Sequence, residues 1–213
     1  GPVPSVPPPP ALPARTAQTA PGPPALASTS RAAPPTVESI LGHLGNPEFA
    51  VRRDAVHACR GRSEPRLREA LVVAATRDSH PNIRGFAIEA LGELHDPALA
   101  PVLRDIIAHE TTPTSVFPRH AALVALGRTR APAAYEPLRA LLGDGSDGGA
   151  AAQALGELGN KRAFEPLMDA LRKPGGTHAI AEHVPTALLT LDRDQAVPAL
   201  LDLFGREPRL VGP

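Results

Sequence analysis

The chain has 213 residues, of which 42% are hydrophobic, enough to bury the core of one ordinary domain or a short repeat array. Basic and acidic residues balance at 22 each and aromatic residues make up only 3%, so the sequence lacks the basic, base-stacking composition expected of a nucleic-acid-binding domain. Its apolar runs are short and broken by charges, far below the roughly 18 residues of a membrane-spanning helix. The single cysteine, Cys59, excludes an intramolecular disulfide and thiolate metal clusters, and we interpret it as a small buried apolar residue.

Residues 1–36 form a Pro/Ala-rich segment that we predict to be a disordered leader or linker. The segment contains twelve of the 27 prolines and no acidic or aromatic residue, so it offers too little apolar surface to offset the entropy cost of ordering. The pair Gly1-Pro2 resembles the remnant left by a tag protease, which leads us to expect that the natural chain begins further upstream. A Pro/Ala-rich tether favours a bacterial cell-envelope location, with the cytoplasm as the alternative.

Residues 37–213 are predicted to form one repeat domain. A branched apolar residue, an Arg, an Ala three positions later and then Ala-Leu-Gly occur together in residues 83–92, and versions of this pattern return along the chain. The positions that close the copies are about 32, 35, 29 and 36 residues apart, inside the 20–50 range of solenoid repeats. These closing positions are Arg60, Gly92, Gly127, Gly156 and Asp192.

Each repeat is predicted to contain two short antiparallel helices. Thr36 precedes the first apolar residues as a helix cap, and a second helix follows with apolar residues at offsets 0, 4, 7 and 8 from Val51. In the later units a proline lies five residues into the unit and is expected to mark the start of the first helix. These prolines are Pro101, Pro137, Pro166 and Pro198. The last helix, ending near Phe204, is predicted either to cap the array or to lack its partner helix.

This pattern resembles HEAT-like repeats, in the short form called PBS-lyase HEAT-like repeats, over about residues 37–204. The resemblance implies an all-α, right-handed α-solenoid of about five antiparallel helix pairs, stabilised by the stacking of neighbouring units. Units four and five depart from the pattern, with residues 147–148 and 183–184 in place of Val-Arg, and we expect these units to be locally distorted.

The resemblance also implies a structural role for a series of arginines. Asp78 and Arg84 match the Asp and Arg that link neighbouring units in such repeats, and Arg52 and Arg119 keep the Arg. Asn46 and Pro113 occupy the Asp position in the other two units. We therefore predict that these arginines form hydrogen bonds between units and do not bind phosphate.

Two stretches have spacings that a metal ion could use. His178 and Glu182 share one helical face, but no third ligand is evident nearby, so we interpret them as part of a polar helix face. Residues 143–149 resemble a calcium loop, yet Gly148 stands at the third ligand position and no Glu closes the loop, which favours a flexible turn. We predict no metal site, no cofactor and no catalytic residue.

The predicted function is that of a non-catalytic scaffold or adaptor that binds another protein along the concave face of the solenoid. The first alternative is a bilin lyase-type enzyme or enzyme subunit, because the repeat takes its name from proteins that attach or detach bilins. The second is a helical-repeat nucleic-acid binder, for which zero net charge predicts little phosphate-driven affinity.

Offsets 2, 3 and 6 of each second helix are predicted to face away from the core and to line the concave groove. The predicted protein-binding residues at these positions are Arg53, His57, Phe86, Glu89, His120, Val124, Gln153 and Leu189. The same offsets also place in the groove Asp54, Gly85, Ala121, Gly149, Ala150, Pro185 and Thr186. Phe86, Val124 and Leu189 are expected to be exposed apolar groups within a polar rim. The alternative, that Phe86 packs beneath the neighbouring unit, stays open.

Overall fold

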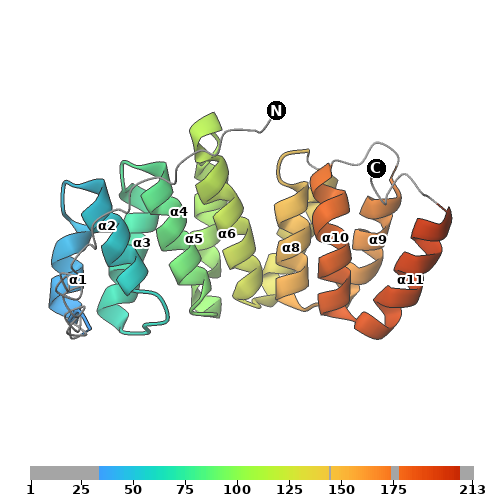
Figure 1. Ribbon diagram of the computed structural model, residues 1–213, viewed down its shortest axis with the longest axis horizontal. Helices are drawn as coiled ribbons and strands as arrows, with labels where there is room; N and C mark the ends of the chain where they lie inside the picture. Colours follow the sequence, from blue (N-terminus) through green and yellow to red (C-terminus); the bar gives the residue numbers. More distant parts are fainter. Residues whose placement is uncertain (1–33, 144, 174–177, 207–213) are drawn as a thin grey trace, which may run out of the picture. The chain divides into compact units, whose positions relative to one another are not determined.

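The computed structural model describes residues 34–143, 145–173 and 178–206. Within these residues the protein is all-α, with eleven α-helices and no strand, arranged as five antiparallel pairs followed by one further helix (Figure 1). The α-solenoid predicted from the repeat is therefore confirmed. Of the predicted leader, residues 1–33 lie outside the described residues.

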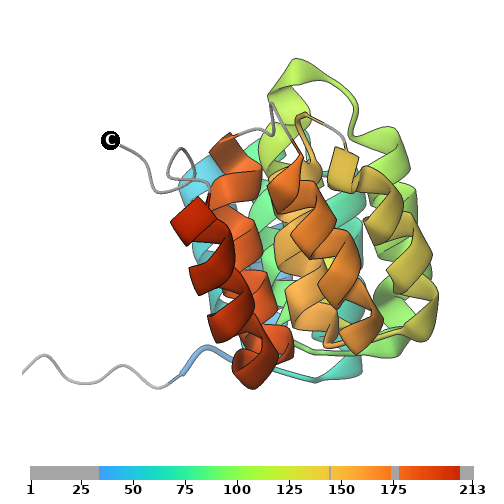
Figure 2. The same cartoon turned by 90° about the vertical axis from the view of Figure 1, so that its right-hand side faces the viewer.

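The two helices of each unit occupy two layers. The first helices are α1 (Val37–Leu44), α3 (Pro65–Arg77), α5 (Ala100–His109), α7 (Tyr135–Ala140) and α9 (Phe164–Arg172). The second helices are α2 (Phe49–Ala58), α4 (Pro81–Gly92), α6 (Val116–Arg128), α8 (Gly148–Leu158) and α10 (His178–Leu191). The array ends at α11 (Arg193–Arg206), which packs against α10 and is nearest the viewer in Figure 2. Short 3₁₀ turns separate some helices, at Pro97–Leu99, Pro113–Ser115, Pro132–Ala134, Leu141–Gly143 and Lys161–Ala163.

The helix starts follow from local capping. The Thr36 side chain accepts a hydrogen bond from the Ser39 backbone N–H at 3.2 Å, as the sequence predicts. In two later units, Asp96 and Asn160 cap the 3₁₀ turn that leads into the first helix. Side-chain acceptors thus cap α1 and the turns that lead into α5 and α9, whereas α3 and the turn before α7 begin without a side-chain cap.

The prediction that the prolines five residues into each unit mark the starts of the first helices holds for α5, α7 and α9, in which the proline lies in the first turn. It is wrong for Pro198, the sixth residue of α11. Asp192 accepts a hydrogen bond from the Gln195 backbone N–H at 3.2 Å and so starts the helix one turn earlier. The segment that forms a separate 3₁₀ turn in other units is continuous with α11.

The second helices stack closely because the last residue of the Ala-Leu-Gly triplet has no side chain. A Cβ atom added at Gly127 would lie 2.2 Å from the carbonyl oxygen of Ala154 in the next unit. At Gly92 it would lie 2.9 Å from the Cβ of Ala125, and at Gly156 the nearest atom would belong to Ala187. Each glycine therefore packs against an alanine of the next second helix.

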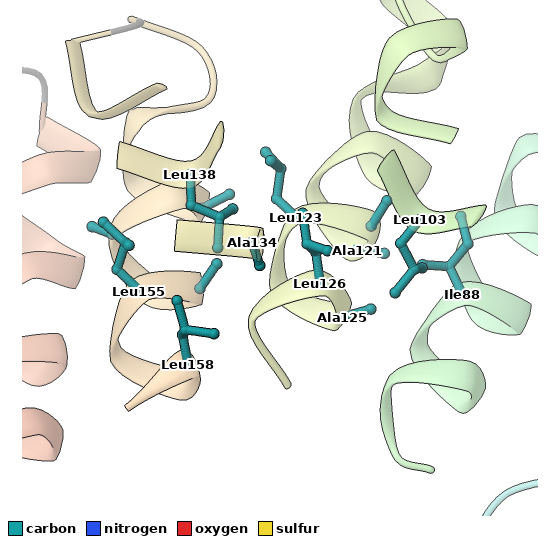
Figure 3. Close-up of a cluster of buried hydrophobic side chains, with 14 of the residues drawn as sticks. Ile88, Leu103, Ala121, Leu123, Ala125, Leu126, Ala134, Leu138, Leu155 and Leu158 are labelled. Carbon is teal, nitrogen blue, oxygen red and sulfur yellow. The ribbon is translucent and has the colours of Figure 1, made fainter. Parts of the chain in front are cut away.

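The core runs continuously through the units. Leu91 and Leu126, predicted to fill the seams, are fully buried. Figure 3 shows Leu123, Leu138 and Leu155, from α6, α7 and α8, as members of one cluster of buried apolar side chains. Because the cluster draws on three helices of two units, neither unit could bury it alone.

Unit four is irregular in its first helix, although its departure from the pattern lies at residues 147–148, where the second helix begins. The helix α7 has only six residues and passes directly into the 3₁₀ turn Leu141–Gly143. Its partner α8 begins with two buried glycines and three buried alanines, so it lies close to both α6 and α10.

Candidate protein-binding face

The outward side of the second helices forms one continuous surface, which we call the second-helix face. It is made by α2, α4, α6, α8 and α10, and each of these helices packs against the next (Figure 1). On the opposite side, hollows of about 400 and 320 Å³ open between α3 and α5 and between α5 and α7. A further hollow of about 370 Å³ lies beside Val116, Arg119 and His120 of α6, so open space is not confined to the first-helix layer.

Three aromatic rings from successive units form a row on this face, the aromatic row of His57, Phe86 and Phe117. The ring centroids of His57 and Phe86 are 5.4 Å apart, and those of Phe86 and Phe117 are also 5.4 Å apart, the latter pair edge to face. Phe117 also covers Gly85, where a Cβ atom would lie 2.2 Å from the ring. The row thus links α2, α4 and α6 while part of Phe86 stays accessible to solvent.

Charged residues along one edge of the face are paired between units. The Arg60 guanidinium lies 2.7 Å from the Glu89 carboxylate and 3.3 Å from that of Glu93. Arg128 and Glu157 form the equivalent pair between α6 and α8, at 3.5 Å. Because these side chains are about one-third exposed, the pairs contribute little to stability, but they set the charge pattern that a partner would meet.

The structure brings the eight predicted residues to the second-helix face with different degrees of exposure. His57 and Leu189 are exposed, Leu189 by 41%. The other six are half-buried: Arg53, Phe86, Glu89, His120, Val124 and Gln153. Arg53 forms an ion pair with its neighbour Asp54 at 2.8 Å, and the His120 ring nitrogen Nε2 lies 3.0 Å from the Ser146 carbonyl oxygen.

The expectation that all positions at offsets 2 and 3 face away from the core is wrong for four residues. These are Gly85, Ala121, Gly149 and Ala150, all of which are buried. The reason is the close stacking of second helices, which buries the flank of each helix as well as its inner side. The same stacking leaves Phe86 and Val124 half-buried, whereas they were expected to be exposed.

The three arginines of the repeat pattern form hydrogen bonds between units, as predicted. Arg52 donates to the carboxylate of Asp78 through Nε and Nη2, at 2.8 and 3.2 Å. Its Nη1 donates to the carbonyl oxygens of Asn46 and Pro47, both at 2.9 Å. One guanidinium therefore binds the turn between the two helices of its own unit and an acid of the next unit.

The same geometry repeats with acids that the sequence analysis did not identify. Arg84 donates to the Asp78 carbonyl oxygen and to the carboxylate of Glu110, and Arg119 donates to the Ile107 carbonyl oxygen and to the carboxylate of Asp147. The acid follows its arginine by 26, 26 and 28 residues: Asp78 and Glu110 come directly after α3 and α5, and Asp147 directly precedes α8. A search for acids 26–28 residues after each arginine would have found all three.

Glu110 is a largely buried acid, with 9% of its surface exposed. Burial alone raises the pKa of its carboxyl, but hydrogen bonds from Arg84 and Ser115 and the charge of Arg84 lower it, so the pKa lies below its ordinary value. Glu110 is thus held ionised by a fixed structural partner.

The candidate metal-binding stretches gain no support. Asp147, in the stretch that resembles a calcium loop but was interpreted as a turn, accepts a hydrogen bond from Arg119. Across the described ranges, no group of three or more His, Cys, Asp or Glu side chains is placed to hold a metal ion. None of the helices in the same ranges is both long and apolar enough to cross a membrane.

Comparison with known families agrees with the geometry. Residues 37–116 match the family of HEAT repeats, and residues 118–144 and 149–173 match the family of the PBS lyase HEAT-like repeat. No curated protein matches the chain. The paired helices, the glycine-to-alanine stacking and the inter-unit arginines all occur within or beside the matched residues. The chain belongs to the HEAT-like repeat proteins.

Proposed function

We propose that this protein is a non-catalytic scaffold or adaptor that binds another protein along the second-helix face. The observation that carries the proposal is the aromatic row. His57, Phe86 and Phe117 cross three units at the surface, and the charges beside them are already paired between units. An apolar centre with a polar, neutralised edge is the usual composition of a protein-binding patch.

The buried polar groups support a non-catalytic role because each has a structural partner. Glu110 and Asp147 pair with Arg84 and Arg119. Thr129 donates to the Leu126 carbonyl oxygen at 2.7 Å, and the Ser115 hydroxyl lies at hydrogen-bond distance from another hydroxyl. In the part of the chain that the structure describes, no buried side-chain polar atom lacks a partner. Polar groups that are already engaged in structural hydrogen bonds are not available as catalytic groups.

The test is affinity capture of proteins from the native host. It compares the wild type with a variant altered on the second-helix face and with a control altered on the opposite, first-helix side. A variant carrying His57→Glu and Leu189→Asp changes exposed positions of the second-helix face without removing core side chains. The control is Val73→Asp on α3, where Val73 is 55% exposed on the first-helix side. We expect a defined protein to be captured by the wild type and the control and reduced at least about tenfold by the double variant, which corresponds to roughly 1.4 kcal/mol of binding free energy.

Two outcomes would contradict the proposal. Equal capture by all three proteins would place the binding site elsewhere. A stable coloured complex with a bilin, measured by absorbance, or tight DNA binding at about 0.15 M salt would instead favour the enzymatic or nucleic-acid-binding alternative.

A further inference from the structure

The hollow of about 320 Å³ between α5 and α7 is lined mainly by aliphatic side chains. The fully buried Leu123, Leu126 and Leu138 contribute to its lining together with the half-buried Ile107 and Leu141. Leu141 belongs to the 3₁₀ turn that follows the six-residue α7, so the irregular first helix of unit four forms one side of the hollow. The volume lies at the lower end of the range of roughly 300–1,000 Å³ that is typical of small-molecule sites.

Two arginines also line the hollow, and the charge of one of them is compensated. Arg119 lies 2.6 Å from the carboxylate of Asp147 and also donates to the Ile107 carbonyl oxygen. Arg104 is exposed and forms no ion pair with any acid in the described part of the chain. Its sequence neighbour Asp105 lines the other hollow, between α3 and α5. The hollow between α5 and α7 therefore carries one uncompensated positive charge.

The next unit shows that this uncompensated charge is a departure from the repeat. Arg139 follows Arg104 by about 35 residues, the spacing of successive Ala-Leu-Gly triplets in this part of the chain. Glu136, one helical turn before Arg139, accepts a hydrogen bond from it at 3.1 Å. The residue of unit three that is equivalent to Glu136 is Pro101, which has no charge. Arg104 thus lacks the acid that its counterpart has, and its guanidinium is free to bind an anion from outside the chain.

We propose that this hollow binds a small aliphatic carboxylic acid, with the tail against the leucines and the carboxylate at the guanidinium of Arg104. One guanidinium compensates one negative charge, which fits a carboxylate better than a phosphate group with a charge of about −2. Among the described residues, no aromatic ring lines the hollow, which favours an aliphatic tail over an aromatic one.

A free acid fits the hollow better than the carboxyl end of a peptide does. Apart from the two arginines, Thr111 is the one polar residue of the lining within the described ranges. The amide groups of a peptide would therefore leave water with few hydrogen-bond partners, a cost that an aliphatic chain does not have. Because the hollow is small and open to solvent, we expect a Kd of roughly 0.1–1 mM.

The proposed site is independent of the proposed protein-binding role. The hollow opens between two first helices, and none of the three rings of the aromatic row lines it. A negative result in the capture experiment on the second-helix face would leave this proposal standing, and the reverse also holds.

The experiment is an NMR titration of the full chain with sodium octanoate, octanol and octylammonium chloride, which share one aliphatic tail and differ in charge. The backbone amide shifts are followed up to roughly 10 mM ligand, above the expected Kd. We expect octanoate to give saturable shifts that centre on α5 and α7. Octanol should bind at least about threefold more weakly, and octylammonium more weakly still, because the charge of Arg104 attracts only the anion.

Three variants test the role of the free guanidinium. Arg104→Gln should weaken octanoate binding at least about threefold, as expected for the loss of one exposed ion pair. The matched control Arg139→Gln removes the equivalent arginine, which does not line the hollow, and should bind octanoate like the wild type. Ala108→Glu, at an exposed position, supplies an acid one helical turn after Arg104 and should weaken binding in the same way.

Circular dichroism checks that each variant is folded, and Ala108→Glu provides the answer if Arg104→Gln is not. Octanoate shifts that do not saturate, or that centre outside α5 and α7, would overturn the proposal. Equal affinities for octanoate and octylammonium would overturn it as well. So would an Arg104→Gln variant that binds like the wild type, or an equal loss in Arg139→Gln, since Arg104 would then not select the ligand.

Discussion

Arg84 and Glu110 lie 26 residues apart in the sequence and form a two-point ion pair between adjacent units, with Nε and Nη2 of the guanidinium on the two carboxylate oxygens at 2.5 and 3.0 Å. The same guanidinium donates to the Asp78 carbonyl oxygen at 3.0 Å. One side chain on α4 therefore connects the ends of α3 and α5. Bidentate pairs of this kind are among the strongest hydrogen-bonded contacts in proteins. Here the pair helps to fix the orientation in which the apolar faces of adjacent units pack.

Replacing Arg84 by Ala should lower the free energy of unfolding by roughly 1.5–3 kcal/mol, the usual contribution of hydrogen bonds to a charged group. The cost arises because Glu110 loses its partner while it stays shielded from water. The control is Arg53→Ala, which removes the more exposed ion pair between Arg53 and its sequence neighbour Asp54. This change should alter the free energy of unfolding by about 0.2–1 kcal/mol at most. Urea unfolding followed by circular dichroism measures both, and equal losses would contradict the structural role of Arg84.

The stability of the array should fall in acid partly through Glu110. Its pKa in the folded protein lies below the ordinary value, so the stabilisation is fully present above the unfolded-state pKa of about 4.3 and is lost as the pH falls through the folded-state value. In Glu110→Gln this pH-dependent part is absent, so the difference in urea midpoint between wild type and variant should shrink from pH 7 toward pH 3. The control is the substitution Glu69→Gln, at a glutamate that is exposed to solvent. A difference that stays constant with pH would rule out this contribution.

Gly127→Ala should destabilise the protein, because the new methyl group would meet the Ala154 backbone, which cannot move aside as a flexible side chain would. Overpacking of this kind costs about 1–3 kcal/mol. Gly42→Ala in α1 is the matched control: no atom lies within 4 Å of its added Cβ, and alanine favours the helix by up to about 1 kcal/mol. Thermal melting should move in opposite directions for the two variants. A stabilised Gly127→Ala would mean that the second helices are not in close contact there.

Cys59 should react with thiol reagents only when the array opens. Its side chain is 1% exposed, and burial is the main cause that raises the pKa of its thiol to about 11, so little thiolate exists at neutral pH. Labelling in native buffer should be slower than in urea by orders of magnitude, and Leu91→Ala, which weakens a buried seam, should accelerate it. Rapid labelling of the native wild type would show that the first units open locally.

Much of the fold followed from the sequence because helical repeats are encoded locally. The period of the Ala-Leu-Gly triplets predicts the units, Thr36 predicts the first helix start, and the leucines of the triplets predict the seams; the structure agrees with each. These features depend on residues within one or two helical turns, or on one pattern repeated in every unit. The inter-unit role of Arg52 was predicted from the resemblance to HEAT-like repeats, whose linking arginine it matches.

Other properties were decided only by how neighbouring units meet. Which acid pairs with Arg84 depends on where α5 ends, and the sequence near Arg84 contains no sign of Glu110. The burial of Gly85 depends on Phe117 from the next unit, which covers it. Each of these contacts joins residues about 30 positions apart, whose distance is set by the packing of one helix pair on the next. The sequence thus determined the repeating unit, whereas the stacking of units determined which of its outward positions remain at the surface.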